Sequence, residues 1–186
     1  MFGGHGHVEG SNKKIALLVA VLAALLAISE MGGKSSQTNA LSSHIDASNT
    51  WTFFQAKTIR QTVVRTAAED LEATYKDNPQ GMPPAVKAQV DRWKQTAQRY
   101  ESEPETNEGR RELSAKAKAK EQQREKSLSA YHMFEYASAA YQLAIVLAGA
   151  AALTSVIWLT FLSAGLGAVG LAFTGLAFLA PTLIHL

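Results

Sequence analysis

The fold is decided by residues 136–186, which read YASAAYQLAIVLAGAAALTSVIWLTFLSAGLGAVGLAFTGLAFLAPTLIHL. This stretch contains no Asp, Glu, Lys or Arg, and it is too long and too apolar for the core of a soluble protein of 186 residues. A helix needs about 20 mainly apolar residues to cross a bilayer, so the stretch is long enough for two spans. The small residues Ser163, Ala164 and Gly165 indicate the turn between them. We therefore predict a second span at 137–162, and a tip with the third span at 163–186.

An earlier apolar run, IALLVAVLAALLAIS at residues 15–29, predicts a first span over 15–33. Lys13 and Lys14 precede the run, but no A-x-A-like cleavage site follows it, which indicates an uncleaved anchor. Residues 1–14 are glycine-rich and polar and are expected to form a flexible tail. The tail contains His5 and His7, but no further ligand lies nearby in the sequence, so no specific metal site is predicted.

Alanine recurs at every fourth residue in all three predicted spans, and small residues at this spacing let helices approach closely. The longest such row is in the second span: Ala140, Ala144, Ala148 and Ala152. Shorter rows occur in the first span (Ala16, Ala20 and Ala24, with Ala23 and Ala27) and in the third (Ala164, Ala168 and Ala172). We expect these rows to be the faces on which the spans pack.

Residues 34–136 are predicted to form a soluble helical stalk. Breaker-rich segments at 77–84 and 101–109 predict two loops, with a helix over 85–100 between them. A further helix should begin at Arg110 and continue into the second span. Before the first loop, apolar residues recur every fourth position, interrupted only by Gln55, and predict one buried stripe along a long helix. They are Trp51, Ile59, Val63, Ala67, Leu71 and Tyr75.

The predicted fold class is all-α: three transmembrane helices with a long water-exposed helical hairpin or bundle between spans one and two. An unbroken helix from Gly32 to Asp77 would be roughly 65 Å long. A lone two-helix hairpin would support such a stalk poorly. We therefore expect coiled-coil packing in a homo-oligomer.

The composition excludes several classes of function. The chain has 18 basic and 16 acidic residues, and its middle region is nearly balanced, which argues against nucleic acid as a partner. It has no cysteine, so disulfides, thiolate metal sites and cysteine nucleophiles are absent. The basic run at 110–126 is interpreted as a solvated helix face, able to pair with the acidic loop at 101–108.

Three patterns resemble chemical sites but lack the required context. GLGAVG at 165–170 matches the dinucleotide fingerprint, but no acid follows Glu135, so we interpret its glycines as helix-packing residues. His132 with Glu135 would be only half of the paired motif of a di-iron bundle. Glu30 is the one acid in an apolar run, and its spacing to Lys34 predicts an ion pair at the membrane boundary rather than a transport site.

The side of the membrane on which the stalk lies is predicted from flanking charges. Lys13 and Lys14 favour a cytoplasmic N-terminus, which places the stalk outside. The basic residues at 116–126, within about 20 residues of the second span, favour the opposite orientation. Because the rule is weak for loops longer than roughly 60 residues, we follow the N-terminal lysines.

Two motifs carry a resemblance to a known family: QTNAL at 37–41 and IDASNTWTFFQAKTIR at 45–60. Together with the plan of a His-bearing tail, one span, a helical middle and two closing spans, they resemble the bacterial domain-of-unknown-function family 4337. The resemblance covers nearly the whole chain. It implies a bacterial membrane protein, here expected in the inner (cytoplasmic) membrane, and it brings no activity and no functional residues with it.

The second motif contains four polar residues around an aromatic cluster: Asn49, Gln55, Lys57 and Arg60. One hypothesis is a polar layer that sets the register of the stalk helices, as buried polar residues do in coiled coils. The other is a pocket for an anionic ligand, in which Lys57 and Arg60 supply the cationic contacts.

The predicted function is structural: a non-enzymatic homo-oligomeric scaffold or an accessory subunit of a membrane complex, without cofactor, metal or catalytic residues. Its expected partners are the lipid bilayer and further copies or other membrane subunits. The alternative is an oligomeric channel or transporter, in which Gln142, Thr154 and Ser155 would face a water-filled path. An enzyme is not predicted, because His132 and Glu135 have no nucleophile or metal motif beside them.

Overall fold

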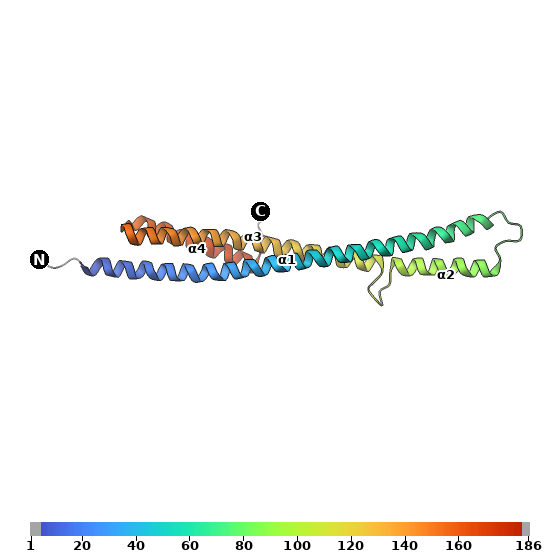
Figure 1. Cartoon of the computed structure of the whole chain (residues 1–186), viewed down its shortest axis with the longest axis horizontal. Coiled ribbons are helices and arrows are strands. Elements are labelled where there is room, and N and C mark those ends of the chain that lie inside the picture. Colours follow the sequence, from blue (N-terminus) through green and yellow to red (C-terminus); the bar gives the residue numbers. More distant parts are fainter. Residues whose placement is uncertain (1–4, 184–186) are drawn as a thin grey trace. The chain divides into compact units, whose positions relative to one another are not determined.

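The computed structural model describes the backbone of residues 5–183 and the side chains of residues 13–183. Its regular elements there are all helices: α1 (His5–Tyr75), α2 (Pro84–Glu101), α3 (Arg110–Thr154) and α4 (Ile157–Leu179) (Figure 1). The all-α prediction is therefore confirmed. The chain divides into two compact units, residues 1–41 with 124–186, and residues 42–123. We call them the span unit and the hairpin unit.

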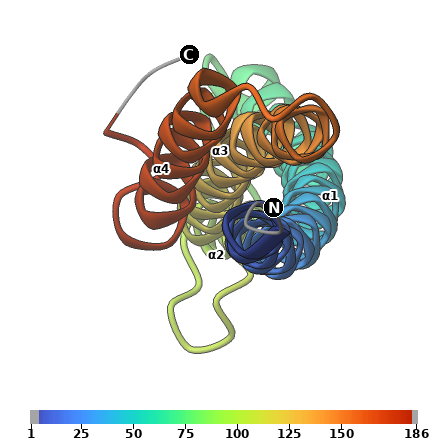
Figure 2. The same ribbon diagram turned by 90° about the vertical axis from the view of Figure 1, so that its left-hand side faces the viewer.

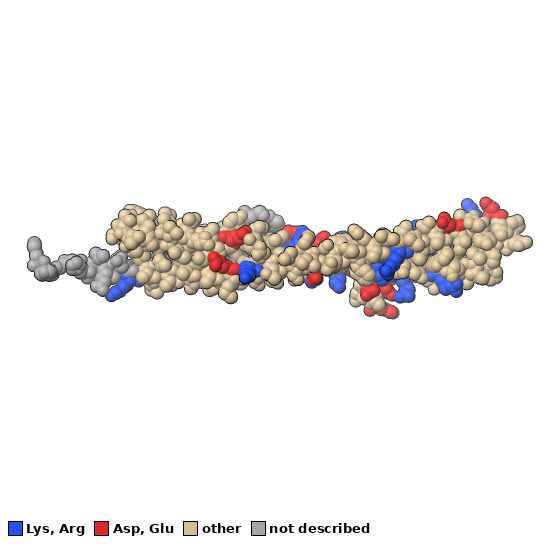
Figure 3. Space-filling view, viewed as in Figure 1, with Lys and Arg blue, Asp and Glu red and all other residues tan. Residues whose placement is uncertain are grey.

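Three helices, α1, α3 and α4, are long and apolar enough to cross a membrane. The prediction of three such helices is confirmed by length and composition. On the face of the span unit seen in Figure 3, a wide area carries no Lys, Arg, Asp or Glu side chain. An uncharged, apolar surface of this kind is compatible with lipid rather than with water.

In the span unit, α1 and α3 run antiparallel and α4 packs against both (Figure 2). Ile15 of α1 clusters with Ala148 and Ala151 near the C-terminal end of α3. Farther along α1, Leu22 clusters with Tyr141, and Gly32 lies against Phe134. Residues later in α1 contact residues earlier in α3, so the two helices are antiparallel.

The buried residues of α3 and α4 repeat with alternating steps of three and four. On α4 they are Ser163, Gly167, Gly170, Thr174 and Ala177. On α3 the row with this spacing is Ala137, Tyr141, Ala144, Ala148 and Ala151, and Ala140 is buried beside it. This spacing is the seven-residue repeat of left-handed helix packing. The interpretation of the 165–170 glycines as packing residues is supported at two positions, because Gly167 lies under Leu22 and Gly170 under Tyr141.

Three hydroxyl groups meet where the three helices of the span unit come together. Thr174 donates to the carbonyl oxygen of Gly170 at 2.9 Å, so its single proton is already used. The hydroxyls of Ser29, at 2.8 Å, and Tyr141, at 3.2 Å, must therefore both donate to the Thr174 oxygen. Each helix contributes one member of this buried layer, and all of its polar atoms are satisfied.

The predicted turn between the last two spans is wrong. We placed it at Ser163, Ala164 and Gly165, but α3 ends at Thr154 and α4 begins at Ile157. Ser155 adopts a positive φ of 58°, which ends α3. Ser163 instead lies inside α4, where its buried hydroxyl donates to the carbonyl oxygen of Ala144 at 2.7 Å. The small residues there serve close packing rather than a turn.

The start of α1 and two of the alanine rows also differ from the predictions. The helix begins at His5, within the segment predicted as a tail, and not at Ile15. Ala140, Ala144 and Ala148 are buried as predicted, but the rows in the first and third spans are exposed. In the first span the buried side chains are instead those of the larger Ile15 and Leu22, together with Ser29.

In the hairpin unit, α2 and then α3 pack against α1, both antiparallel to it. Polar contacts trace the pairing along α1: Glu72 bonds to Lys94, Gln61 to the carbonyl of Ala97, and Thr58 to Arg110. Nearer the start of the unit, Trp51 donates to Glu121 at 2.8 Å. α2 and the beginning of α3 thus act as one partner helix that is interrupted by the loop at 102–109.

The predicted stripe on α1 is only partly correct. Ile59 and Val63 are 65% and 62% exposed, whereas Lys57 and Ala68 are buried. Successive steps of four residues rotate by about 40° around an α-helix, so a strict row of that spacing cannot stay on one face. The buried side follows a seven-residue repeat instead, which includes Ala47 and Ala68, three repeats apart.

The glycine contacts in α4 predict which substitutions the span unit tolerates. A Cβ at Gly170 would lie 2.7 Å from Cε1 of Tyr141, so Gly170→Ala should destabilise the unit by about 1–3 kcal/mol. A Cβ at Gly165 or Gly175 would meet nothing within 4 Å. Gly165→Ala and Gly175→Ala should therefore be neutral or stabilising. Detergent unfolding followed by circular dichroism measures the difference, and equal midpoints for all three variants would contradict the packing.

The helix directions predict that the two ends of the span unit are exposed on opposite faces of the membrane. Ser155 lies at the end that contains Ile15, and the exposed Ser35 lies at the other end of the same stretch of α1. Because the chain has no cysteine, Ser155→Cys and Ser35→Cys each introduce a unique thiol. A membrane-impermeant maleimide should label them from opposite faces of the membrane. Labelling of both from one face would rule out three spans.

Candidate functional site

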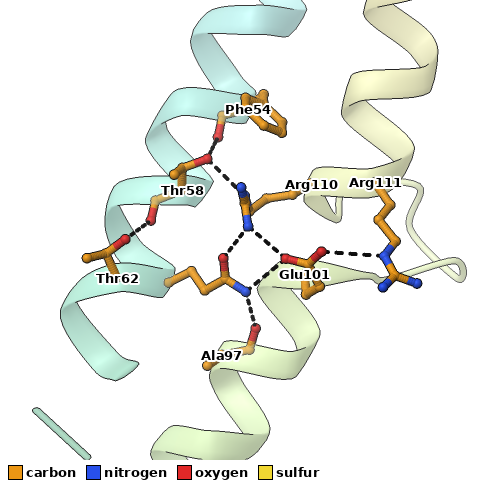
Figure 4. Close-up of polar contacts among 8 residues, drawn as sticks. Phe54, Thr58, Thr62, Ala97, Glu101, Arg110 and Arg111 are labelled. Atoms are coloured by element: carbon orange, nitrogen blue, oxygen red, sulfur yellow. Dashed lines mark hydrogen bonds and ion pairs between the residues drawn. The ribbon is translucent and has the colours of Figure 1, made fainter. Parts of the chain in front are cut away.

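Arg110, at the first position of α3, is the centre of a polar network in the hairpin unit (Figure 4). Its guanidinium donates to Thr58 at 2.9 Å and to Gln61 at 2.6 Å, both on α1, and to Glu101 at 2.7 Å, the last residue of α2. It also lies 5.1 Å from the centre of the Phe54 ring. One planar cation with several fixed donors therefore connects three helices.

Lys57, one helical turn before Gln61 on α1, is buried and has four partners. Its amino group lies 3.8 Å from a carboxylate oxygen of Glu103 and 3.7 Å from one of Glu108. It also lies 5.5 Å and 5.4 Å from the ring centres of Phe53 and Tyr100. A buried ammonium needs such compensation, because desolvation of an unpaired charge is costly. The loop at 102–109 supplies the countercharge.

Glu112 closes the base of this loop. Its carboxylate accepts a hydrogen bond from the hydroxyl of Ser102 at 2.6 Å and another from the backbone N–H of Glu103 at 3.2 Å. Gly109 lies directly against these groups, because a Cβ there would clash with the Glu112 carboxylate and with the backbone of Ser102 and Glu103. The end of α2 and the start of α3 are thereby held together across the loop.

The carboxyl groups of the network are stabilised in their charged form. The hydrogen bond from Gln61 lowers the pKa of Glu101 below its ordinary value of 4.5, and Arg110 and Arg111 add to the effect. The hydrogen bond from Arg99 lowers the pKa of Glu103, and the hydrogen bond from Ser102 lowers that of Glu112. Hydrogen bonds to a carboxylate favour the ionised state.

The contacts of Lys57 favour the hypothesis of a register-setting layer over that of an anion pocket. Lys57 is already paired with carboxylates, and Arg60 is exposed on α1. A cavity of about 430 Å³ does lie in the hairpin unit, but its lining includes neither residue. Its walls are Phe54, Glu101, Arg110, Arg111, Ser114, Ala115 and Lys118.

A second polar cavity, of about 340 Å³, lies in the span unit between α1 and α3. Its lining includes Glu30, Lys34, Glu135 and Gln142. The predicted ion pair between Glu30 and Lys34 is not formed, and neither has an ion-pair partner among the described residues. Both side chains are exposed, and ordering two long exposed side chains costs more entropy than such a pair returns.

The remaining residues singled out from the sequence do not converge on one site. His132 lies 3.3 Å from Glu135, but no group of three potential metal ligands occurs among the described residues. Thr154 donates to the carbonyl of its own helix at Ala150, and Ser155 forms the turn, away from Gln142. The side chains of His5 and His7 lie outside the described residues.

The network residues outside α1 were not individually identified from the sequence. Pairing between the basic run and the acidic loop was expected, and Arg110 and Arg111 do pair with Glu101. The central role of Arg110 was missed, as was the closure of the loop by Glu112. The sequence signal for the position of Arg110 was Gly109, which ends the loop at 102–109. It places Arg110 at the start of α3, next to that loop.

The lowered carboxyl pKa values predict acid sensitivity of the loop at 102–109. Groups with a folded pKa below the unfolded value contribute stability above about pH 4.5, and this contribution is lost as pH falls through the folded values. The protection of the backbone amides of 102–109 from hydrogen exchange, corrected for the intrinsic rate at each pH, should therefore fall below that pH. In Glu112→Gln the protection should be lower at neutral pH and vary less with acidification. Unchanged protection in acid would contradict the network.

Comparison with known proteins gives a single result. No curated protein and no solved structure matches the chain. Residues 11–180, which include most of α1 and all of α2, α3 and α4, match the family model described as Domain of unknown function (DUF4337). The match covers most of the sequence and confirms the resemblance drawn from residues 37–60. The chain is a member of the DUF4337 family.

Proposed function

We propose that this protein is a non-enzymatic integral membrane protein that acts as a homo-oligomeric scaffold or as an accessory subunit of a membrane complex. The observation that carries the proposal is that the buried cations of the hairpin unit bind other parts of the same unit. Lys57 and Arg110 are its two most buried cations. Lys57 is paired with a carboxylate of the 102–109 loop and with the Tyr100 ring of α2, and Arg110 with Glu101 of α2 and the Phe54 ring of α1. Cations that are paired in this way hold the helices of the hairpin unit in fixed positions. The outer surface of the unit is then rigid enough to bind another protein.

The span unit supports membrane insertion. Large apolar side chains on α4 are exposed in the single chain, including Trp158, Phe161, Leu171 and Phe178. Exposed apolar surface of this extent is stable in contact with lipid and unfavourable in water. We place the protein in a bacterial inner membrane, with Lys13 and Lys14 on the cytoplasmic side and residues 42–123 outside.

The second candidate is an oligomeric channel or transporter, and one observation favours it. The cavity that contains Glu30, Glu135 and Gln142 also reaches Ser29, the first member of the buried hydroxyl layer. Carboxylates near hydroxyl groups in a membrane occur in proton and cation paths. Against this role, the proton of Thr174 is directed to a backbone carbonyl, and Thr154 and Ser155 are not part of the same cavity.

The mass of the complex extracted from its native membrane in a mild detergent tests the proposal. A scaffold should appear as a multimer, alone or with a second protein in fixed proportion. A multimer that also conducts ions in liposomes, with a loss of flux in Glu30→Gln, would support the channel instead. A monomer without any copurifying protein would contradict both. Matched flux measurements on Ser35→Ala provide the control, because Ser35 does not line the cavity.

A further inference from the structure

The side of α1 that faces away from its partners in the hairpin unit carries a second seven-residue repeat. Its positions alternate in steps of four and three and contain no charged residue: Ile45, Asn49, Thr52, Ala56, Ile59 and Val63. All are exposed except Ala56, which is half-buried. We call this set the outer seam. An uncharged repeat with this spacing is the pattern that packs against another helix.

The outer seam has no counterpart on the other helices of the hairpin unit. The exposed side of α2 carries charges such as Asp91, Arg92 and Arg99, and that of α3 carries Arg111 and Lys118 within residues 110–123. A charged surface of this kind is adapted to water. The uncharged seam is therefore a property of α1, and Ile59 and Val63 give it an apolar centre.

We propose that the outer seam packs against the outer seam of a second copy of this chain, as a parallel coiled coil of two α1 helices. The occupant must be a helix with the same uncharged repeat, and α1 itself supplies one. The inference deepens the proposed function and depends on it, because insertion in one membrane gives every copy of α1 the same direction. Parallel helices of identical sequence pair in register.

The same spacing occurs on α1 in the span unit, which is an independent indication of the partner. There the exposed residues Leu17, Val21, Ala24, Ile28 and Met31 again alternate in steps of four and three. Met31 and Ile45 are separated by two full heptads, so the two stretches share one sequence register. A water-soluble partner would match only the part in the hairpin unit. A second copy of α1 matches both.

The polar and charged residues at the seam fit parallel pairing. In register, Asn49 meets Asn49 of the second copy, and two amides can hydrogen-bond each other, which is how a core asparagine specifies alignment in coiled coils. Of the flanking charges, Asp46 already pairs with Lys120 of its own chain. Arg60 would lie beside Gln55 of the second copy. Like charges therefore do not oppose one another.

Disulfide formation in native membranes tests the seam, because the full chain has no cysteine. Thr52→Cys lies in the outer seam, and Ala119→Cys is an exposed control on α3. Mild oxidation should convert most Thr52→Cys protein into a covalent dimer of the chain and leave Ala119→Cys monomeric. Equal dimer formation by both, no dimer at Thr52, or a cross-link from Thr52 to a different protein would each overturn the proposal.

A charged residue introduced into the outer seam should weaken the dimer, and the same charge introduced outside the seam is the control. Ile59→Glu in the Thr52→Cys background should reduce dimer formation by about tenfold or more, because it places two like charges in the interface. Ala119→Glu should not change it. Both positions are exposed in the single chain, so helical content should be unaffected. Val63→Gln adds a polar group but no charge. In the same Thr52→Cys background it should reduce dimer formation less than Ile59→Glu does.

The mass measurement separates this inference from the proposed function. A multimer whose Thr52 cysteine does not cross-link would overturn the seam and leave the scaffold in place. A monomer without a partner would overturn both. Cross-linking at Thr52 that Ile59→Glu leaves unchanged would also overturn the packed seam, because it would indicate random collision.

Discussion

The seven-residue repeat of α1 is the constraint on which the rest of the structure depends. Side chains that recur every 3.5 residues stay on one face of a helix only when that helix packs against neighbours with a matching repeat. In both units the partners meet this requirement, with α3 and α4 in one and with α2 and the start of α3 in the other. The long helix gains its stability from these contacts, since intrinsic propensity alone contributes little.

The two units use different polar chemistry to fix the same kind of packing. In the span unit, the hydroxyls of Ser29 and Tyr141 bond to that of Thr174, which donates to a backbone carbonyl, and no charged side chain among the described residues is buried there. In the hairpin unit, the corresponding role belongs to Arg110 and Lys57 with their carboxylates. The difference agrees with the apolar composition of the three long helices, because a charge is costly in hydrocarbon but can be compensated at a partly hydrated site.

The loop at 102–109 is the part of the hairpin unit in which length and sequence can change. It interrupts the helix that partners α1, yet Glu112 fastens its base and Lys57 holds its acidic residues. Such a loop can be lengthened or changed in sequence without displacing α2 from α3, provided that these anchors remain.

The sequence by itself determined the number of apolar helices, the two stalk loops and the helix that runs from Arg110 into the second span. These follow from local properties: a long uncharged stretch, prolines and glycines, and uninterrupted helix formers. It also identified Lys57 and Asn49 as residues of interest, but not their partners.

The tertiary structure alone decided which face of each helix is buried and where the last turn lies. Ile59 and Val63 were predicted to lie in a buried stripe, and Ser163 in a turn, because residue type and spacing were the only guides. The buried face of a helix is determined by the elements that pack against it. Gly167 and Gly170 lie inside α4, under Leu22 and Tyr141, and the turn lies at Ser155. Contacts between residues distant in sequence set these features, and no local pattern encodes them.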